Sequence, residues 1–175
     1  MLAILKKINI RNKMLIAYVA PAAIYLGLPI LVYQTTTQVL GSFQEVERIE
    51  NVIGLTNNIS AGTEQMVRGL RGYLINQNPL FLKDFKTGAE LARQSGNNVE
   101  PIIKNPQQKT RLQKMLSLSN EYYNNSNEIV NLLQANKKTE ALAIFNTGKH
   151  TKFVNEFVET HRQFSELESD LIRVC

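Results

Sequence analysis

The sequence contains a single cysteine among 175 residues, and it is the last residue, Cys175. One cysteine excludes an intrachain disulfide, and no Cys/His spacing typical of a zinc site is present. We interpret Cys175 as an inert terminal thiol rather than as a lipidation site or an intermolecular bridge. The two histidines, His150 and His161, lie three helical turns apart on an expected helix, too far apart to share a metal ion. We expect both to be surface residues.

Motifs of catalysis are missing as well. The sequence has no Gly-rich phosphate-binding loop, no nucleophile elbow, no metal motif and no plausible carboxylate pair. His161, within Glu159-Thr160-His161-Arg162, lacks the surroundings of the phosphate-accepting histidine of a kinase. The sequence therefore predicts no catalytic, cofactor-binding or metal-binding residues, and it indicates that the chain is not an enzyme.

Acidic residues are absent before Glu45, whereas Lys6, Lys7, Arg11 and Lys13 precede it. The net charge of +5 is therefore local: the other 16 Lys and Arg face all 15 Asp and Glu, which leaves +1 for the rest of the chain. A nucleic-acid-binding protein needs a basic face on its folded part. The charge distribution argues against nucleic acid as a partner and favours a basic segment that flanks a membrane.

No charged residue occurs from Met14 to Gln44, and the apolar part of this stretch is Met14–Tyr33. A helix of this length spans roughly 30 Å, the thickness of the hydrocarbon core of a bilayer. Pro and Gly within the stretch would weaken a helix in water but are tolerated in membranes. We therefore predict a transmembrane helix at residues 14–34, in contact with the lipid bilayer.

The positive-inside rule gives the expected orientation. Residues 1–13 carry four positive charges, whereas the first charged residues on the other side include three acids, Glu45, Glu47 and Glu50. We therefore expect a cytoplasmic N-terminus and a translocated C-terminal part in a single-pass protein. The alternative is a cleaved signal peptide, but the apolar core is long and no good cleavage site follows it.

After Gln34 the sequence lacks the alternation of β-strands and indicates helices separated by polar turns. The first helix should continue out of the membrane to about Ile75. Asn78 and Asn105 each precede a proline, a pattern typical of a helix cap followed by the first helical residue. Pro101 should kink or end the second helix.

Apolar residues recur in steps of three and four along each expected helix, which predicts narrow seams of the coiled-coil type. A short apolar helix near residues 141–145 should precede a break at Thr147-Gly148 and the last long helix. Four helices joined by short turns predict an all-α fold, in which the transmembrane helix continues into an up-down-up-down four-helix bundle at 38–172. The expected seam residues are Val39, Phe43, Val46, Ile49, Ile53, Val67, Leu70, Leu74, Leu82, Phe85, Ala89, Ala92, Gly96, Val99, Ile103, Leu112, Met115, Tyr122, Ile129, Leu133, Phe153, Phe157, Thr160, Phe164, Leu167, Leu171 and Val174.

Small polar residues interrupt two of these seams, at Thr56, Ser60 and Thr63 on the first helix and at Ser119 and Ser126 on the third. One interpretation is a polar notch that binds a ligand and responds to it. The other interpretation is hydrated core, or hydroxyls bonded back to their own helix. A polar aromatic pocket at Tyr122-Tyr123 and the neighbouring asparagines is a further candidate, although one tyrosine of such a pair usually packs and the other is exposed.

The stretch that ends the first bundle helix resembles the third class of CHASE domain, the cyclase/histidine-kinase-associated sensory extracellular domain. The resemblance is strongest at Arg71-Gly72-Tyr73-Leu74, followed by Pro79 and Phe81, and is weaker at Asn105-Pro106 and around Gly148. It covers residues 38–172 approximately. From the residues alone, the role of the signature is expected to be structural, because Gly permits close helix packing and Tyr buries its ring.

The resemblance implies a sensory bundle on a bacterial receptor, in the cytoplasmic (inner) membrane, with the bundle periplasmic or extracellular. It implies input to a histidine kinase, a nucleotide cyclase or a chemoreceptor region, although the sequence shows neither a second membrane span nor an output domain. We expect a homodimer through the transmembrane and first bundle helices, with a small-molecule ligand or an envelope protein as partner. The alternatives are a membrane-anchored helical scaffold and a damping partner of another receptor.

Overall fold

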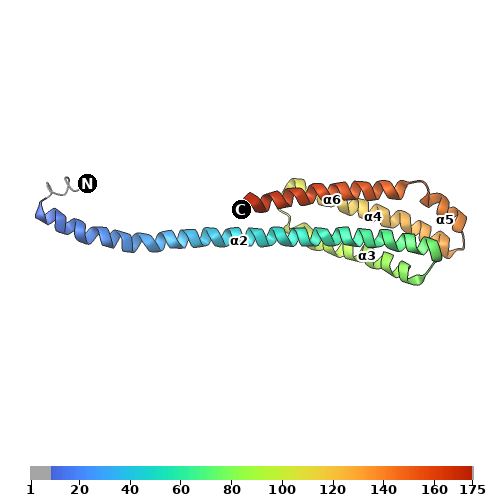
Figure 1. Cartoon of the computed structure of the whole chain (residues 1–175), viewed down its shortest axis with the longest axis horizontal. Helices are drawn as coiled ribbons and strands as arrows, with labels where there is room; N and C mark the ends of the chain where they lie inside the picture. The colour runs from blue at the N-terminus through green and yellow to red at the C-terminus, as the bar shows by residue number, and fades with distance from the viewer. Residues whose placement is uncertain (1–8, 175) are drawn as a thin grey trace. The chain divides into compact units, whose positions relative to one another are not determined.

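The structure is a computed structural model that describes residues 9–174, and within them it contains helices and no strand. Figure 1 shows the order of these helices along the chain. Their bounds are α2 (Ile10–Asn76), α3 (Pro79–Val99), the short 3-10 helix η1 (Glu100–Ile102), α4 (Pro106–Gln134), α5 (Lys138–Phe145) and α6 (Lys149–Val174). The expectations for Lys6, Lys7 and Cys175 lie outside the described residues.

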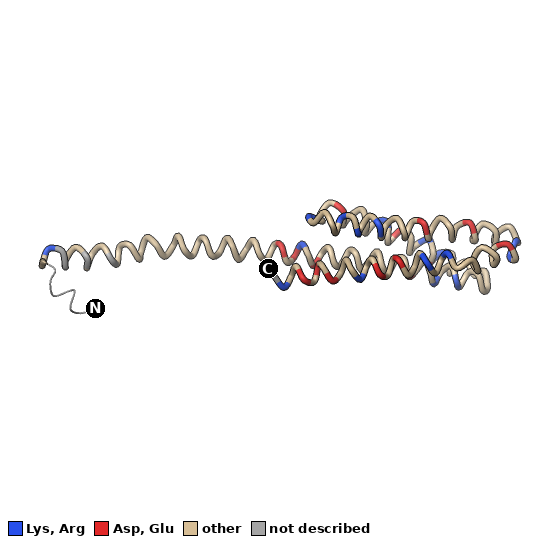
Figure 2. The backbone as a smooth tube through the Cα atoms, turned by 90° about the horizontal axis from the view of Figure 1, so that it is seen from above, with Lys and Arg blue, Asp and Glu red and all other residues tan. Residues whose placement is uncertain are grey.

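The chain divides into two compact units, Met1–Glu45 and Val46–Cys175. In the first unit, α2 passes through Pro21 and Pro29 without ending, as expected for a membrane helix. Among the described residues, α2 is the one helix long and apolar enough to cross a bilayer, and its most apolar stretch has no buried side chain. The uncharged part of α2 is visible as an unbroken tan run in Figure 2. The structure thus agrees with the predicted apolar helix.

The second unit is a bundle of the C-terminal part of α2 with α3, α4 and α6, whose chain directions alternate in Figure 1. The helix boundaries follow the polar turns of the sequence. Asn78 caps α3 by accepting the Leu80 amide at 2.9 Å, and Asn105 caps α4 by accepting the Gln107 amide at 2.8 Å. The expected end of the second helix is confirmed, because α3 stops at Val99 and Pro101 lies in η1.

The bundle core consists of two clusters of buried side chains. One contains Leu70, Phe85, Tyr122 and Ile129 and extends to Ala141 of α5, which closes one end of the bundle. The other is built on buried side chains from α2, α3, α4 and α6, among them Val52, Val99, Met115, Phe157 and Phe164. The seam predicted for α4 is confirmed at every position, including Ser119 and Ser126.

The seam of α2 differs from the prediction in two ways. Val39 and Phe43 are exposed, Phe43 by 68%, and they belong to the N-terminal unit rather than to the bundle core. Within the bundle, α2 buries a second stripe beside the predicted one, seven residues apart at each step: Val52, Ile59, Met66 and Tyr73. A helix that packs against more than one neighbour needs such a wider apolar face, so the narrow-seam interpretation was wrong for α2.

Two glycines allow α2 and α3 to pack with their backbones in contact. A Cβ atom built on Gly62 would lie 2.5 Å from the Gly88 carbonyl oxygen, and one built on Gly88 would lie 2.5 Å from the Gly62 carbonyl oxygen. No side chain fits at either position without moving a helix. The close approach of α2 and α3 fixes the position of α3 in the bundle. Against α4, α3 packs less extensively than α6 does.

Candidate functional site

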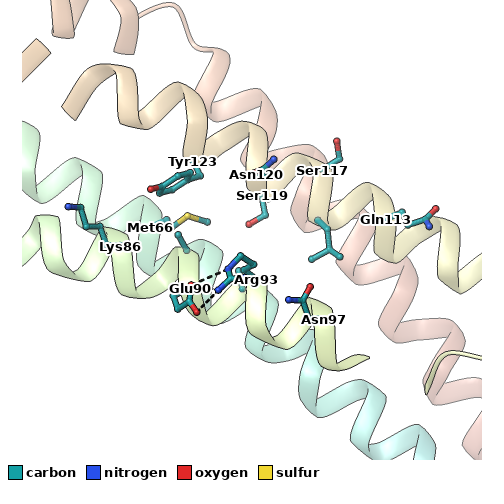
Figure 3. A pocket seen from close by; sticks show the side chains of 13 residues that line it. Met66, Lys86, Glu90, Arg93, Asn97, Gln113, Ser117, Ser119, Asn120 and Tyr123 are labelled. Carbon is teal, nitrogen blue, oxygen red and sulfur yellow. Dashed lines mark hydrogen bonds and ion pairs between the residues drawn. The ribbon is translucent and has the colours of Figure 1, made fainter. Parts of the chain in front are cut away.

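A groove of about 670 Å³ lies between α3 and α4, with its floor on α2. Figure 3 shows its polar side chains projecting from the two walls. The groove exists because both helices carry polar residues at positions where tightly packed helices carry apolar ones. Its size falls in the range typical of small-molecule sites.

The α3 wall presents Lys86, Glu90, Arg93 and Asn97, which recur at steps of four, three and four residues and therefore share one helix face. Arg93 donates from Nη2 to Glu90 Oε1 at 2.7 Å and from Nε to Glu90 Oε2 at 3.1 Å. These hydrogen bonds from Arg93, and one from Gln94, hold the pKa of the Glu90 carboxyl below its usual value. The pair is exposed, so it contributes little stability and mainly fixes where the guanidinium lies.

Lys86, on the same wall, has an exposed ammonium with no ion-pair partner among the described residues. Since Glu90 compensates Arg93, the side chains that line the groove carry one uncompensated positive charge, that of Lys86.

The α4 wall is uncharged and consists of Gln113, Ser117, Asn120 and Tyr123, again on one helix face. The Tyr123 ring stacks on Phe85 with a centroid distance of 5.3 Å and an interplanar angle of 10°. This stacking fixes one end of the wall. The wall therefore offers two amides and a phenol that can both donate and accept hydrogen bonds.

The floor of the groove is made of Met66, which is 1% exposed, with Ala92 and Ser119. Ser119 forms a buried hydrogen bond with Thr63, with 3.0 Å between the hydroxyl oxygens. The Thr63 hydroxyl also donates to the Ile59 carbonyl at 2.9 Å, and since it has one proton, Ser119 is the donor to Thr63. This bond links α2 directly to α4 beneath the groove.

The predicted polar notch is thus assembled only in part. Thr63 and Ser119 meet, whereas the buried Thr56 bonds back to the Val52 carbonyl of its own helix at 2.9 Å. Ser60 is half-buried and does not line the groove, and Ser126 is buried elsewhere on α4 with no hydrogen-bond partner for its hydroxyl.

The tyrosine pair divides much as the sequence suggested. Tyr122 is buried in the core, and burial is the main cause that raises its pKa to about 12. Tyr123 is half-buried and lines the groove together with Asn120, whereas Asn124 is exposed and does not line it.

The residues of the family signature lie around the α2–α3 turn. A Cβ atom on Gly72 would overlap the ring of Phe81, so the ring packs directly against the glycine. Tyr73 and Leu74 are buried in the core cluster. Arg71 is exposed, and Pro79 is the exposed first residue of α3. None of the six lines the groove.

The expectation that both histidines are surface residues was wrong. His150 is 5% exposed and packs between Tyr122, at 5.5 Å between ring centroids, and Phe145, at 5.6 Å. Neither of its ring nitrogens has a hydrogen-bond partner, and burial, with a smaller effect of the Lys149 charge, lowers its pKa. His161 is half-buried and stacks on Phe157. For His150 the cause is α5, whose Phe145 stacks on its ring in the first turn of α6.

A buried polar cluster between α4 and α6 was missed in the sequence. Gln108 is completely buried and donates from Nε2 to the Phe164 carbonyl at 2.8 Å and to Glu168 Oε1 at 2.9 Å. Glu168 is 2% exposed, and its second oxygen has no partner. Gln108 lies four residues before the seam residue Leu112, and Glu168 lies four residues after the seam residue Phe164. The helical spacing alone could therefore have placed both side chains on buried helix faces.

Among the described residues, no group of three His, Cys, Asp or Glu side chains is placed to hold a metal ion. The fold and the groove define the class of protein: the chain has a helix long and apolar enough to span a membrane, followed by a helical bundle with a polar groove.

Comparison with known families identifies the bundle. Residues 43–174 match the CHASE3 domain, so the chain belongs to the CHASE3 domain family, as the signature around Gly72 predicted. CHASE3 is a sensory, extracellular-type domain of signalling receptors. No curated protein matches the chain, and no solved structure matches it.

Proposed function

We propose that the chain is the extracytoplasmic input module of a transmembrane receptor of the histidine kinase, nucleotide cyclase or chemoreceptor type. The observation that carries the proposal is the CHASE3 match over residues 43–174 in a chain whose first bundle helix, α2, begins as an apolar helix of membrane-spanning character. A helix shared between a membrane span and a sensor is a direct route for a signal, because packed helices shift between discrete arrangements.

In this proposal, the stimulus acts on the packing of α2 against its neighbours. Three contacts support this: the backbone contact at Gly62 and Gly88, the bond from Ser119 to Thr63, and the groove floor at Met66. A ligand that prefers one arrangement of α3 and α4 over another shifts the population of the bundle. The shift is felt by α2 because α2 forms the floor of the same groove.

The proposal includes a location and an assembly. The N-terminus is cytoplasmic and the bundle lies in the periplasm or outside the cell, because the basic residues precede the apolar helix and the acids follow it. The receptor is a homodimer through the membrane helix and the first bundle helix, since single spans signal most simply by rearranging against a partner helix. Replacing Asn57, an exposed bundle residue, by cysteine in a Cys175→Ser background and labelling intact cells with an impermeant maleimide tests the orientation.

A reversible crosslink tests the signalling function. The chain would be joined after residue 174, which removes Cys175, to the second span and kinase of a receptor that has lost its own sensor, and it would carry Thr63→Cys and Ser119→Cys. The two native hydroxyls are 3.0 Å apart, so an oxidised pair would fix α2 to α4. We expect oxidation to change kinase output and a reductant to restore it, with each single cysteine variant as control.

The alternative function, a membrane-anchored scaffold, makes the opposite prediction. If the crosslink forms, as shown by mobility on a non-reducing gel, and kinase output in the chimera does not change, the bundle does not relay a signal and the scaffold is favoured.

A further inference from the structure

We propose that the groove between α3 and α4 binds a small organic monocarboxylate that also carries hydroxyl or amide groups. The inference deepens the proposed sensory function and rests on it for its biological meaning, whereas the binding itself is tested independently. Three properties of the groove carry it: one uncompensated cation, an uncharged wall of amides and a phenol, and a largely apolar floor.

The charge of the groove favours a single negative charge on the ligand. The guanidinium of Arg93 already donates hydrogen bonds to both carboxylate oxygens of Glu90. Among the residues that line the groove, the charged group without a counterion is the ammonium of Lys86. A carboxylate carries one charge, whereas a phosphate monoester carries about −1.5 to −2 at neutral pH and would leave excess charge beside Glu90. The opposite wall offers no further cation, so the groove matches a monoanion.

The opposite wall specifies the rest of the ligand. Gln113 and Asn120 each provide an amide that donates and accepts, and Tyr123 provides a phenol held in place by its stacking on Phe85. A purely apolar acid, such as a fatty acid, would leave these groups without partners once water is displaced. Hydroxyl or amide groups on the ligand would satisfy them.

The floor limits the apolar part of the ligand. Ala89 and Ala92 on α3 and Leu116 on α4 leave a strip bounded below by Met66. A few CH groups of a sugar ring or a short chain fit there, and the volume of about 670 Å³ suits such a molecule with room for solvent on its open side. A ligand seated on Met66 would contact three helices at once, so it would bind differently to different arrangements of the bundle.

Methyl NMR of methionine tests the proposal on the full chain in nanodiscs. The chain contains four methionines, of which Met66 forms the groove floor and Met115 is buried on α4 without lining the groove. The probes are D-galacturonate, D-gluconate and N-acetyl-L-glutamine, each with a neutral match: galactose, D-gluconamide and N-acetyl-L-glutamine amide. Galactose 6-phosphate supplies the dianion.

We expect at least one monocarboxylate to shift the Met66 resonance in a saturable way, with a Kd below about 1 mM, and to leave Met115 unshifted. The neutral match and the dianion should bind at least about tenfold more weakly. Lys86→Gln should weaken binding by roughly tenfold, because it removes the uncompensated cation, whereas Lys83→Gln, on the same helix but outside the groove, should not.

Any of three results would overturn the proposal: no saturable Met66 shift with any monocarboxylate, equal binding of the neutral matches, or equal weakening by the two lysine variants. Failure here is separate from failure of the sensory function, because the binding assay needs no output domain. The crosslink at Thr63 and Ser119, in turn, needs no ligand.

Discussion

The backbone contact between α2 and α3 predicts that the same Gly→Ala substitution at two positions of one helix changes the thermal stability in opposite directions. Gly62→Ala places a Cβ 2.5 Å from the Gly88 carbonyl oxygen and 2.8 Å from the Ala92 amide nitrogen, so the helices must move apart. Gly54→Ala, two turns earlier, meets nothing within 4 Å. Both positions are inside the same helix, so the gain in helix propensity is common to the two variants.

The expected magnitudes follow from these contacts. Overpacking a well-packed interface costs about 1–3 kcal/mol, whereas Ala in place of Gly at an open helix position gains about 0.5–1 kcal/mol. For a cooperative unit of roughly 130 residues, the entropy of unfolding is about 0.27 kcal/mol per degree. For Gly62→Ala, the propensity gain of about 0.5–1 kcal/mol offsets part of the overpacking cost and leaves a net loss of up to about 2.5 kcal/mol. We therefore expect Gly62→Ala to lower the Tm by up to about 9 °C and Gly54→Ala to raise it by about 2–4 °C.

Thermal unfolding of the full chain in detergent, followed by far-UV circular dichroism, measures both shifts. Gly88→Ala is a third variant with the same expected sign as Gly62→Ala, because its Cβ would meet the Gly62 carbonyl. If Gly62→Ala raises the Tm as much as Gly54→Ala does, the two backbones are not in contact, and the account of how α3 is positioned fails with them.

Three further predictions follow from buried polar groups. Burial lowers the pKa of His150 in the folded chain below the ordinary value of 6.5, so below about pH 6.5 the unfolded chain binds more protons than the folded chain. The contribution of neutral His150 to the free energy of unfolding is therefore fully present above about pH 6.5 and is lost as the pH falls below it, and His150→Phe should flatten this dependence of the Tm. Gln108→Leu should cost about 2–3 kcal/mol in urea unfolding, because it leaves the Glu168 carboxylate buried without its donor. Thr63→Val should cost about 1 kcal/mol, and adding Ser119→Ala should restore most of it, because the second change removes the hydroxyl left without a partner.

Matched variants separate these effects from general damage. Gln107→Leu, next to Gln108 but exposed, should change the free energy of unfolding by less than about 0.5 kcal/mol. If the Tm of His150→Phe depends on pH as the Tm of the unchanged chain does, the burial of His150 is not the source of that dependence. A Thr63→Val, Ser119→Ala double variant less stable than either single variant would show that the two hydroxyls act independently rather than as a pair.

The polar notch shows that helical spacing in the sequence predicts which residues are buried but not which of them meet. Steps of three and four placed Thr63 and Ser119 on buried faces of α2 and α4, but they placed Thr56, Ser60 and Ser126 there in the same way. Which residues meet depends on the rotation and axial offset of one helix against another, and no pattern within a single helix contains that information. The structure brings together only the one pair, at 3.0 Å.

Of the groove, the sequence indicated Asn120 and Tyr123, as part of a polar aromatic pocket, and Ser119, as part of the polar notch, and the rest was missed for a related reason. Lys86, Glu90 and Arg93 are typical of a solvent-exposed helix face, and so are Gln113, Ser117 and Asn120. Nothing in the sequence distinguishes two exposed faces that point away from each other from two that border one groove. The glycine contact between α2 and α3 and the stacking of Tyr123 on Phe85 are what place these faces opposite each other.

The sequence alone determined the features that depend on local chemistry: the apolar helix without charge from Met14 to Gln44, the Asn-Pro caps at the starts of α3 and α4, the all-helical class and the family signature. These follow from hydrogen bonding and burial within one segment, so a segment suffices to specify them. Only the tertiary structure decided that His150 is buried under α5, that Gln108 meets Glu168, and that α3 and α4 enclose a groove over Met66. Each of these depends on contacts between segments far apart in the chain, and such contacts are fixed by how whole helices pack.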